Sequence, residues 1–310
     1  MPSRKTKSET EERSIIVKRP HKRRYGAKAS LQVAHPGSVG HLEAVTILLP
    51  TGSFATLEKT KSQSWEPGER ISVTLSGFAT ASSAESEGRR LVQAVLWTSV
   101  SLNVPIRLQY SSVEPVTVYD RTASRGAVMS ATLTTGWNTD IVAASIRGGF
   151  DSLPEPDRDL LLSMEIFTGA GLETSPRARF LSTVSALEPL AAAQDIGGDI
   201  DEFVDSCLDR LRAMSLDPVM RSSMLSRVGH LRRESIGQAI RRVVGAALPD
   251  DRDALQVVQL AYSVRSEVVH GGKPSDDDLE LGELERQVGG VLRRIYAKRL
   301  GSELRARAAV

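Results

Sequence analysis

The sequence predicts an α+β protein, in which a small N-terminal α+β domain is followed by an all-α helical bundle. Three observations support this prediction: alternating apolar residues in the first half, one long amphipathic helix among them, and helical periodicity without a convincing strand after residue 155. The character of the chain changes near Gly148-Gly149. We therefore expect the α+β domain at residues 25–150 and the bundle at residues 151–310.

Apolar runs and turn residues predict the strands of the first half. Residues 42–49 form a short apolar run that ends at Pro50-Thr51-Gly52. Residues 70–78 alternate, with Ile71, Val73 and Leu75 on one side, which is the pattern of a half-buried strand. The remaining strand candidates are residues 106–110, 116–118, 127–134 and 140–146.

Helical spacing predicts one long helix in the first half and a series of helices in the second. Ser82-x-x-Glu85 has the pattern of a capping box, and the apolar residues behind it keep helical spacing over residues 82–102. In the second half, the expected helices are residues 157–168, 175–193, 199–214, 217–247, 251–269 and 280–304. The segment 217–247 is either one helix or two, broken near Gly229 or Gly237.

Composition excludes several classes of protein. No run approaches 18 apolar residues, which argues against a membrane span, and the single Cys207 excludes a disulfide framework. The five histidines do not have metal-ligand spacing, so we expect neither a metal site nor another cofactor. The basic N-terminus is not followed by an apolar region of a secretory signal, which favours a cytoplasmic location.

The first 24 residues are strongly basic. They contain nine Lys or Arg and three Glu, a net charge of +6, and end at Lys22-Arg23-Arg24. Two interpretations stay open: a disordered, solubilising segment, or a segment that binds nucleic acid through contacts with phosphates.

Arg265 stands out in the segment 251–269. The stripe of Leu255, Val258, Tyr262, Arg265 and Val269 has spacings of 3, 4, 3 and 4, which places an arginine on an apolar face. Since burial of an unpaired arginine is strongly unfavourable, Arg265 should meet a carboxylate, a partner subunit or a bound anion.

His270 follows five residues after Arg265 and precedes Gly271-Gly272, which should end the helix. Residues five apart lie about 140° apart around a helix axis. A site that uses both Arg265 and His270 therefore needs His270 to turn back at the helix end, or needs copies from two subunits. Upstream, Glu188 shares a stripe with Leu181 and Val184, which makes it a natural partner for Arg265.

A family resemblance rests on these residues. Residues 265–271, which are Arg-Ser-Glu-Val-Val-His-Gly with Tyr262 ahead of them, resemble the Arg-x4–6-His signature of HEPN domains, in particular of the Apea-like branch. Residues 177–180 and the Ala-Leu-Glu at 186–188 resemble an earlier helix of that branch. The resemblance covers residues 155–305. Ser266 fits the Apea-like branch, whereas well-studied HEPN ribonucleases often have Asn, Asp or His there.

The resemblance implies a helical bundle that forms a homodimer and cleaves RNA without a metal ion. Arg265 and His270 carry over as the catalytic pair, with Glu188, Ser266 and Tyr262 as supporting residues. A ribose 2′-hydroxyl would attack the adjacent phosphodiester and leave a 2′,3′-cyclic phosphate and a 5′-hydroxyl. Histidine is suited to moving protons near neutral pH, and arginine to holding a phosphate.

Two rival hypotheses accompany the ribonuclease. The first is a non-catalytic HEPN module that dimerises and binds RNA or a partner protein. The second is a DNA-associated protein held by its basic N-terminal segment, although the sequence has no recognition-helix signature. Family analogy alone extends the ribonuclease to phage defence or toxin-like growth arrest, with a protein trigger or antitoxin as a further partner. No membrane partner is expected.

Overall fold

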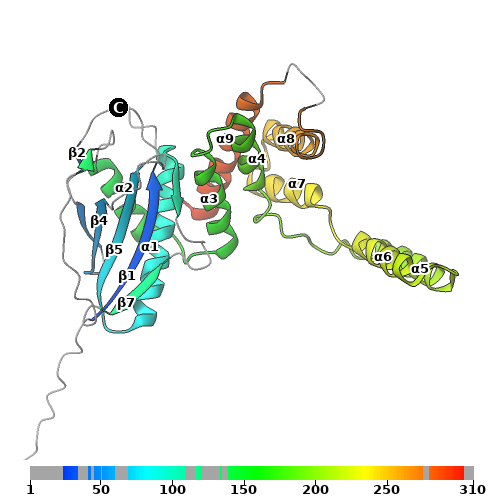
Figure 1. Ribbon diagram of the computed structural model, residues 1–310, viewed down its shortest axis with the longest axis horizontal. Coiled ribbons are helices and arrows are strands. Elements are labelled where there is room, and N and C mark those ends of the chain that lie inside the picture. Colours follow the sequence, from blue (N-terminus) through cyan, green and yellow to red (C-terminus); the bar gives the residue numbers. More distant parts are fainter. Residues whose placement is uncertain are drawn as a thin grey trace, which may run out of the picture.

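The computed structural model describes residues 24–33, 41–42, 45–49, 51–59, 69–108, 116–120, 133–134, 139–274 and 279–303. This part of the chain combines an antiparallel sheet, a long helix against the sheet, and a group of helices that follows (Figure 1). The predicted α+β class is confirmed. The division of the chain at residue 150 stays a prediction.

The main sheet is antiparallel and has β1 near its centre. Its strand order is β3-β4-β5-β1-β6, and β7 pairs with β1 beside β6. The strands are β1 (Tyr25–Val33), β3 (Val45–Leu48), β4 (Phe54–Lys59), β5 (Glu69–Phe78), β6 (Ile106–Leu108) and β7 (Thr117–Asp120). A separate pair joins β2 (His41–Leu42) to β8 (Leu133–Thr134). The strand expected at 70–78 is confirmed as β5, whereas β1 and β4 were not predicted.

Small residues explain why β1 gives a weak sequence signal. Its inward positions include Ala27 and Ala29, both buried, and alternating alanines differ little from polar residues in hydropathy. These small side chains let helix α1 (Ala81–Leu102) approach closely: a Cβ added at Gly88 of α1 would lie 2.9 Å from the Cβ of Ala27. The same small residues that weaken the strand pattern therefore allow the helix to pack on the strand.

Helix α1 confirms the long helix expected over 82–102, but its N-cap is not the predicted one. Thr80 caps the helix, and its side chain accepts a hydrogen bond from the Ser83 backbone N–H at 3.1 Å. The helix therefore begins two residues before the Ser82–Glu85 pattern would place it. Asn103 ends the helix in the left-handed conformation, with φ of 55°.

The strand expected at 140–146 is wrong, because residues 139–152 form helix α2 (Thr139–Ser152). The β-branched residues and the Gly148-Gly149 pair favoured a strand followed by a break. Instead, α2 continues through both glycines, and a Cβ added at Gly149 would lie 3.4 Å from Ala94 and Trp97 of α1. The close packing of α2 on α1 accounts for a glycine in the middle of a helix.

The second half is helical, as predicted. Its elements are α3 (Arg158–Ala170), α4 (Pro176–Ser185), α5 (Asp199–Ala213), α6 (Pro218–Gly229), the 3-10 turn η1 (His230–Arg232), α7 (Ile236–Ala247), α8 (Arg252–Gly271) and α9 (Leu281–Leu300). The segment 217–247 is two helices, broken between Gly229 and Ile236. Helix α4 is eight residues shorter at its C-terminus than the expected 175–193, because Pro189 has no N–H for a helical hydrogen bond and disfavours the helical conformation at the residue before it.

The hydrophobic core continues from the sheet into the helices. Tyr296 of α9 is fully buried, lies 2.7 Å from the Ser163 hydroxyl, and its phenol pKa is raised by burial. Arg293 of α9 donates to the backbone carbonyls of Val100 and Ser101 at the end of α1. The bundle that carries Arg265 is therefore packed and hydrogen-bonded to the helix that covers the sheet.

Candidate functional site

Helix α8 carries Arg265 on the edge of its buried face. The buried residues of α8 are Ala254, Val258, Ala261, Val264 and Val268. This stripe lies about one residue away from the predicted one, and Val269, expected on the apolar face, is 54% exposed. At two positions the small Ala254 and Ala261 are buried, whereas the larger Leu255 and Tyr262 are only partly buried. Arg265 thus lies at the border between core and solvent.

Arg265 forms an ion pair with Glu188. The Arg265 Nη2 lies 2.8 Å from the Glu188 Oε1, and the side chains are 27% and 32% exposed. The Arg265 Nε donates to the Ser185 hydroxyl at 3.4 Å, and the guanidinium lies 5.9 Å from the Tyr262 ring centroid. The expectation that Arg265 meets a carboxylate is confirmed, with the predicted glutamate as its partner. Both charges are only partly buried, which differs from the predicted burial.

Glu188 lies in a turn and not on a helix. Helix α4 ends at Ser185, and the following backbone makes i→i+3 hydrogen bonds, including one from Glu188 N to Ser185 O at 3.1 Å. Glu188 is the third residue after Ser185, and this turn brings both side chains to Arg265. Ser185 was not predicted, although the same three-residue spacing from Glu188 could have identified it.

His270 remains inside α8 and does not turn back toward Arg265. The helix runs to Gly271, and its C-cap is Gly272, with φ of 80° and an N–H that donates to the Val268 carbonyl. The two glycines therefore end the helix, as expected. His270 is in helical conformation and exposed, about 140° around the axis from Arg265. Ser266 is also exposed and lies four residues before His270, so α8 places Ser266 and His270 on one side and Arg265 on another.

The basic N-terminal segment is described only at its last residue. The Arg24 guanidinium lies 2.5 Å from the carboxylate of Asp120, which pairs with the adjacent Tyr25 in the β1–β7 ladder, and 5.1 Å from the Tyr25 ring. Arg24 therefore has a structural contact at the sheet. Lys22 and Arg23 lie outside the described residues, and RNA binding by the segment stays a prediction.

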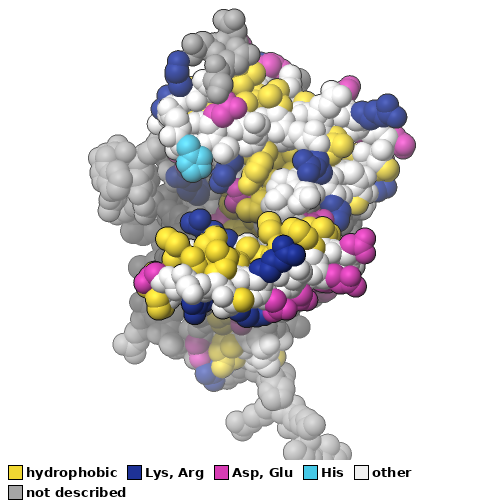
Figure 2. Space-filling view, turned by 90° about the vertical axis from the view of Figure 1, so that its right-hand side faces the viewer, with side chains coloured by type: hydrophobic (Ala, Val, Ile, Leu, Met, Phe, Trp, Pro, Cys, Tyr) yellow, Lys and Arg dark blue, Asp and Glu magenta, His cyan; other side chains and the backbone are white. Residues whose placement is uncertain are grey.

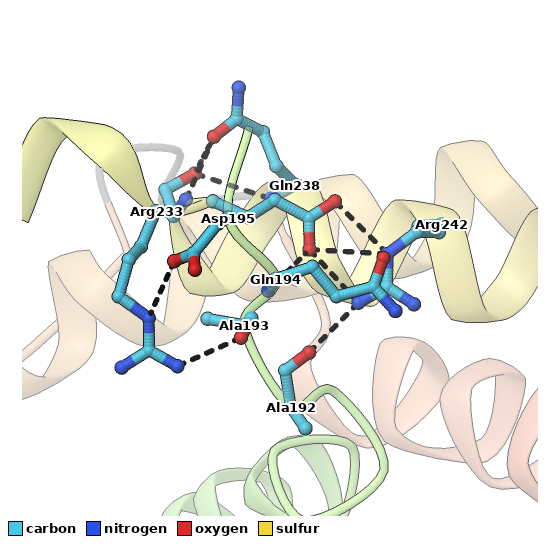
Figure 3. A network of polar contacts seen from close by, with 9 residues as sticks. Ala192, Ala193, Gln194, Asp195, Arg233, Gln238 and Arg242 are labelled. Carbon is cyan, nitrogen blue, oxygen red and sulfur yellow. Dashed lines mark hydrogen bonds and ion pairs between the residues drawn. The ribbon is translucent and has the colours of Figure 1, made fainter. Parts of the chain in front are cut away.

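A second arginine–glutamate pair, Arg242 and Glu234, contacts the segment that follows the Glu188 turn (Figure 3). Arg242 of α7 donates from Nε to both carboxylate oxygens of Glu234, at 3.0 and 3.1 Å, and from Nη2 to the Ala192 carbonyl at 2.8 Å. The hydrogen bond from Arg242 lowers the pKa of Glu234. This pair was not predicted, although the Ser235-x-x-Gln238 pattern marks the start of α7, where a capping box forms.

Comparisons with known proteins identify no relative of this chain. No protein-family model matches the chain, and no curated protein or solved structure matches it significantly. Among the described residues, no helix is long and apolar enough to cross a membrane. The same part of the chain contains no group of three or more His, Cys, Asp or Glu side chains that could hold a metal ion.

The arrangement around Arg265 is suited to holding an anion. The guanidinium is oriented by Glu188, Ser185 and Tyr262, yet more than a quarter of its side chain is exposed. A planar, permanently charged guanidinium at a solvent border can bind a phosphate while it keeps a carboxylate partner.

Proposed function

We propose that this protein is a metal-independent endoribonuclease of the HEPN type that acts as a homodimer. The observation that carries the proposal is the oriented, partly exposed Arg265 on the helix that also presents His270 near its C-terminus. In this reaction Arg265 stabilises the charge on the phosphodiester, and His270 moves a proton to or from the reacting oxygens. The 2′-hydroxyl that attacks the phosphodiester makes RNA the substrate.

The directions of the two side chains on α8 favour a site shared by two chains. Because His270 and Arg265 diverge around the helix axis, Arg265 of one chain would face a phosphate together with His270 of the other. A two-fold axis would form two equivalent sites, each with Arg265 of one chain and His270 of the other.

The experiment that tests this function is cleavage of RNA by the full chain in excess EDTA, with analysis of the product ends. We expect cleavage to persist and to leave 2′,3′-cyclic phosphate and 5′-hydroxyl ends. Loss of cleavage on chelation with recovery in magnesium, or 5′-phosphate ends, would rule the mechanism out.

The second candidate function is a non-catalytic HEPN module that dimerises and binds RNA or a partner protein. The ion pair with Glu188 favours it, because the pair already partly neutralises Arg265. Under this hypothesis His270→Ala leaves RNA or partner binding unchanged, and the wild-type chain leaves RNA intact after prolonged incubation.

A further inference from the structure

A hairpin of two helices extends from the rest of the molecule. Helices α5 and α6, followed by η1, form the right-hand end of Figure 1 and pack on one another. The buried residues of α5 are Val204 and Leu211, and no residue of α6 is buried. Helices this short are not stable by themselves in water and need an apolar face packed on a neighbour. The hairpin therefore has very little core of its own.

Large apolar side chains are exposed on this hairpin and at its base. Of the thirteen large hydrophobic residues that are exposed in the described part of the chain, nine lie between residues 196 and 236. We name this set the apolar face; it comprises Ile196, Ile200, Phe203, Met214, Val219, Met220, Met224, Leu231 and Ile236. Val219 is 79% exposed and Phe203 58%. Concentrated exposure of this kind marks an interaction surface, whereas single exposed apolar residues do not.

The apolar side chains gather on one side of the hairpin. Figure 2 looks onto the hairpin from its tip and shows hydrophobic side chains along its upper side, next to a hollow that separates it from the helices above. Along the sequence, Met220 and Met224 are four residues apart on α6, and Ile200 and Phe203 three apart on α5, which places each pair on one side of its helix. The residues of the apolar face on α5 and α6 thus form a stripe and are not dispersed over the hairpin surface.

The hairpin is held in a fixed direction at its base. The two connecting segments pair as an antiparallel bridge between Asp195 and Arg233, and the Ile196 N–H donates to the Arg232 carbonyl at 2.7 Å. Arg233 also donates to the Ala193 carbonyl at 2.9 Å (Figure 3). Because these bonds fix the hairpin before any partner binds, docking on it loses less conformational entropy.

The charges of the hairpin are self-complementary. Helix α5 carries five carboxylates and two arginines, a net charge of −3, whereas residues 218–233 carry four arginines and no carboxylate, a net charge of +4. A two-fold axis that places α5 of one chain against α6 of another brings acidic and basic helices together twice. An anionic membrane surface or RNA would be attracted by α6 but repelled by α5, so it complements only half of the hairpin.

We infer that the apolar face docks on a second copy of this chain, with α5 of each copy against α6 of the other, to form an intermolecular four-helix bundle. Each partner in a stable interface buries about 800 Å², contributed by roughly 20–30 residues. The segment 196–236 supplies residues on that scale, with apolar side chains at its centre and charged ones around them. Methionine is also enriched in protein interfaces. This inference names the interface of the homodimer proposed above and rests on that part of the proposal, but it does not depend on RNA cleavage.

The first test is sedimentation equilibrium of the full chain at micromolar concentration. We expect a dimer for the wild type and a monomer for Phe203→Glu/Met220→Glu. The matched control is Leu48→Glu/Phe54→Glu, which changes two equally exposed apolar residues of the sheet and should remain a dimer. Circular dichroism should show unchanged helix content in both variants. A monomeric wild type, a dimeric hairpin variant, or wild-type binding to phospholipid vesicles without dimerisation would overturn the inference.

A charge exchange tests the pairing of α5 with α6 directly. Glu202 and Arg227 are exposed and lie beside the apolar face, on α5 and α6 respectively. Glu202→Arg and Arg227→Glu should each weaken the homodimer at least tenfold, and a mixture of the two variants should form a heterodimer close to wild-type affinity. A mixture no tighter than either variant alone would show that α5 does not face α6 of the second copy.

Discussion

Two arginine–glutamate pairs flank the turn after α4, and they differ in how completely the arginine is used. The Arg242 Nε donates hydrogen bonds to both carboxylate oxygens of Glu234. Its Nη2 donates to Glu234 and to the Ala192 carbonyl. Arg265 has one close contact with Glu188, at 2.8 Å, and a long one with Ser185, at 3.4 Å. The first pair closes the base of the hairpin, whereas the second orients a guanidinium that still faces solvent.

The comparison separates a structural arginine from a candidate catalytic one. A guanidinium with several hydrogen bonds in one plane holds two chain segments together. A phosphate could bind to it only by displacing these hydrogen bonds. A guanidinium held by one carboxylate can bind a phosphate on its remaining edge. The residue type is the same, and the number of protein partners decides what it can do.

The largest expected effect is on cleavage when either member of the proposed catalytic pair is removed. Arg265→Ala and His270→Ala should each lower the rate of RNA cleavage by about 10²-fold or more, because a charge stabiliser or proton carrier is lost. The measurement is the single-turnover rate in EDTA. Arg242→Ala is the control and should keep the cleavage rate within a few-fold of wild type. Equal losses of cleavage in all three variants would show that Arg265 and Arg242 do not differ in their part in cleavage.

Loss of Arg242 should lower the thermal stability more than cleavage. Its removal leaves Glu234 without its main partner and the Ala192 carbonyl without a donor. The comparison is the melting temperature of Arg242→Ala against that of Arg212→Ala, which removes an exposed i,i+3 pair with Asp209. The Arg242 variant should melt clearly lower, and similar melting temperatures would show that the network at the hairpin base is not structural.

Glu188→Gln should reduce cleavage less than Arg265→Ala does, since Glu188 orients the guanidinium and does not move protons. The amide keeps the hydrogen bond but loses the charge, so the free energy of unfolding should fall by about 1 kcal/mol or less. Kinetics and denaturant unfolding of the same sample check both effects. A loss of cleavage as large as that of Arg265→Ala would assign Glu188 a part in the chemistry itself.

The pair at the hairpin base predicts a dependence of stability on pH. Arg242 holds the pKa of Glu234 below its ordinary value of 4.5, so the ionised pair stabilises the fold above that pH and is lost as the pH falls through the lower folded-state pKa. Denaturant unfolding of wild type and Glu234→Gln should therefore differ at pH 7 and converge in acid. A difference that grows as the pH falls would contradict the sign.

The smallest expected effect follows from deletion of residues 2–23, which keeps the Arg24–Asp120 contact. The deletion should weaken RNA binding at low salt and flatten its salt dependence, because phosphate contacts are lost. The cleavage rate at saturating RNA should stay nearly unchanged. Loss of turnover at saturation would place part of the active site in this segment.

The helices and the Arg265–Glu188 pair were predictable because large apolar residues and charges repeat at helical spacing. Strand β1 was not predictable, since Ala27 and Ala29 give little hydropathy contrast. Helix α2 was not, since Gly149 packs closely on α1 and does not break the helix. The turn at Glu188 follows from Pro189. The helix expected over 175–193 rested on apolar periodicity and did not take this proline into account. The direction of the hairpin depends on backbone hydrogen bonds between residues 40 apart, which no local pattern encodes.

The central claim is that Arg265 of one chain and His270 of another act on the same phosphodiester. The most direct measurement mixes Arg265→Ala chains with His270→Ala chains, allows subunits to exchange, and follows RNA cleavage in EDTA. Each mixed dimer retains one arginine and one histidine on opposite chains. We expect the mixture to cleave RNA well above the rate of either variant alone. A mixture as inactive as its components, with mixed dimers verified by mass, would contradict it.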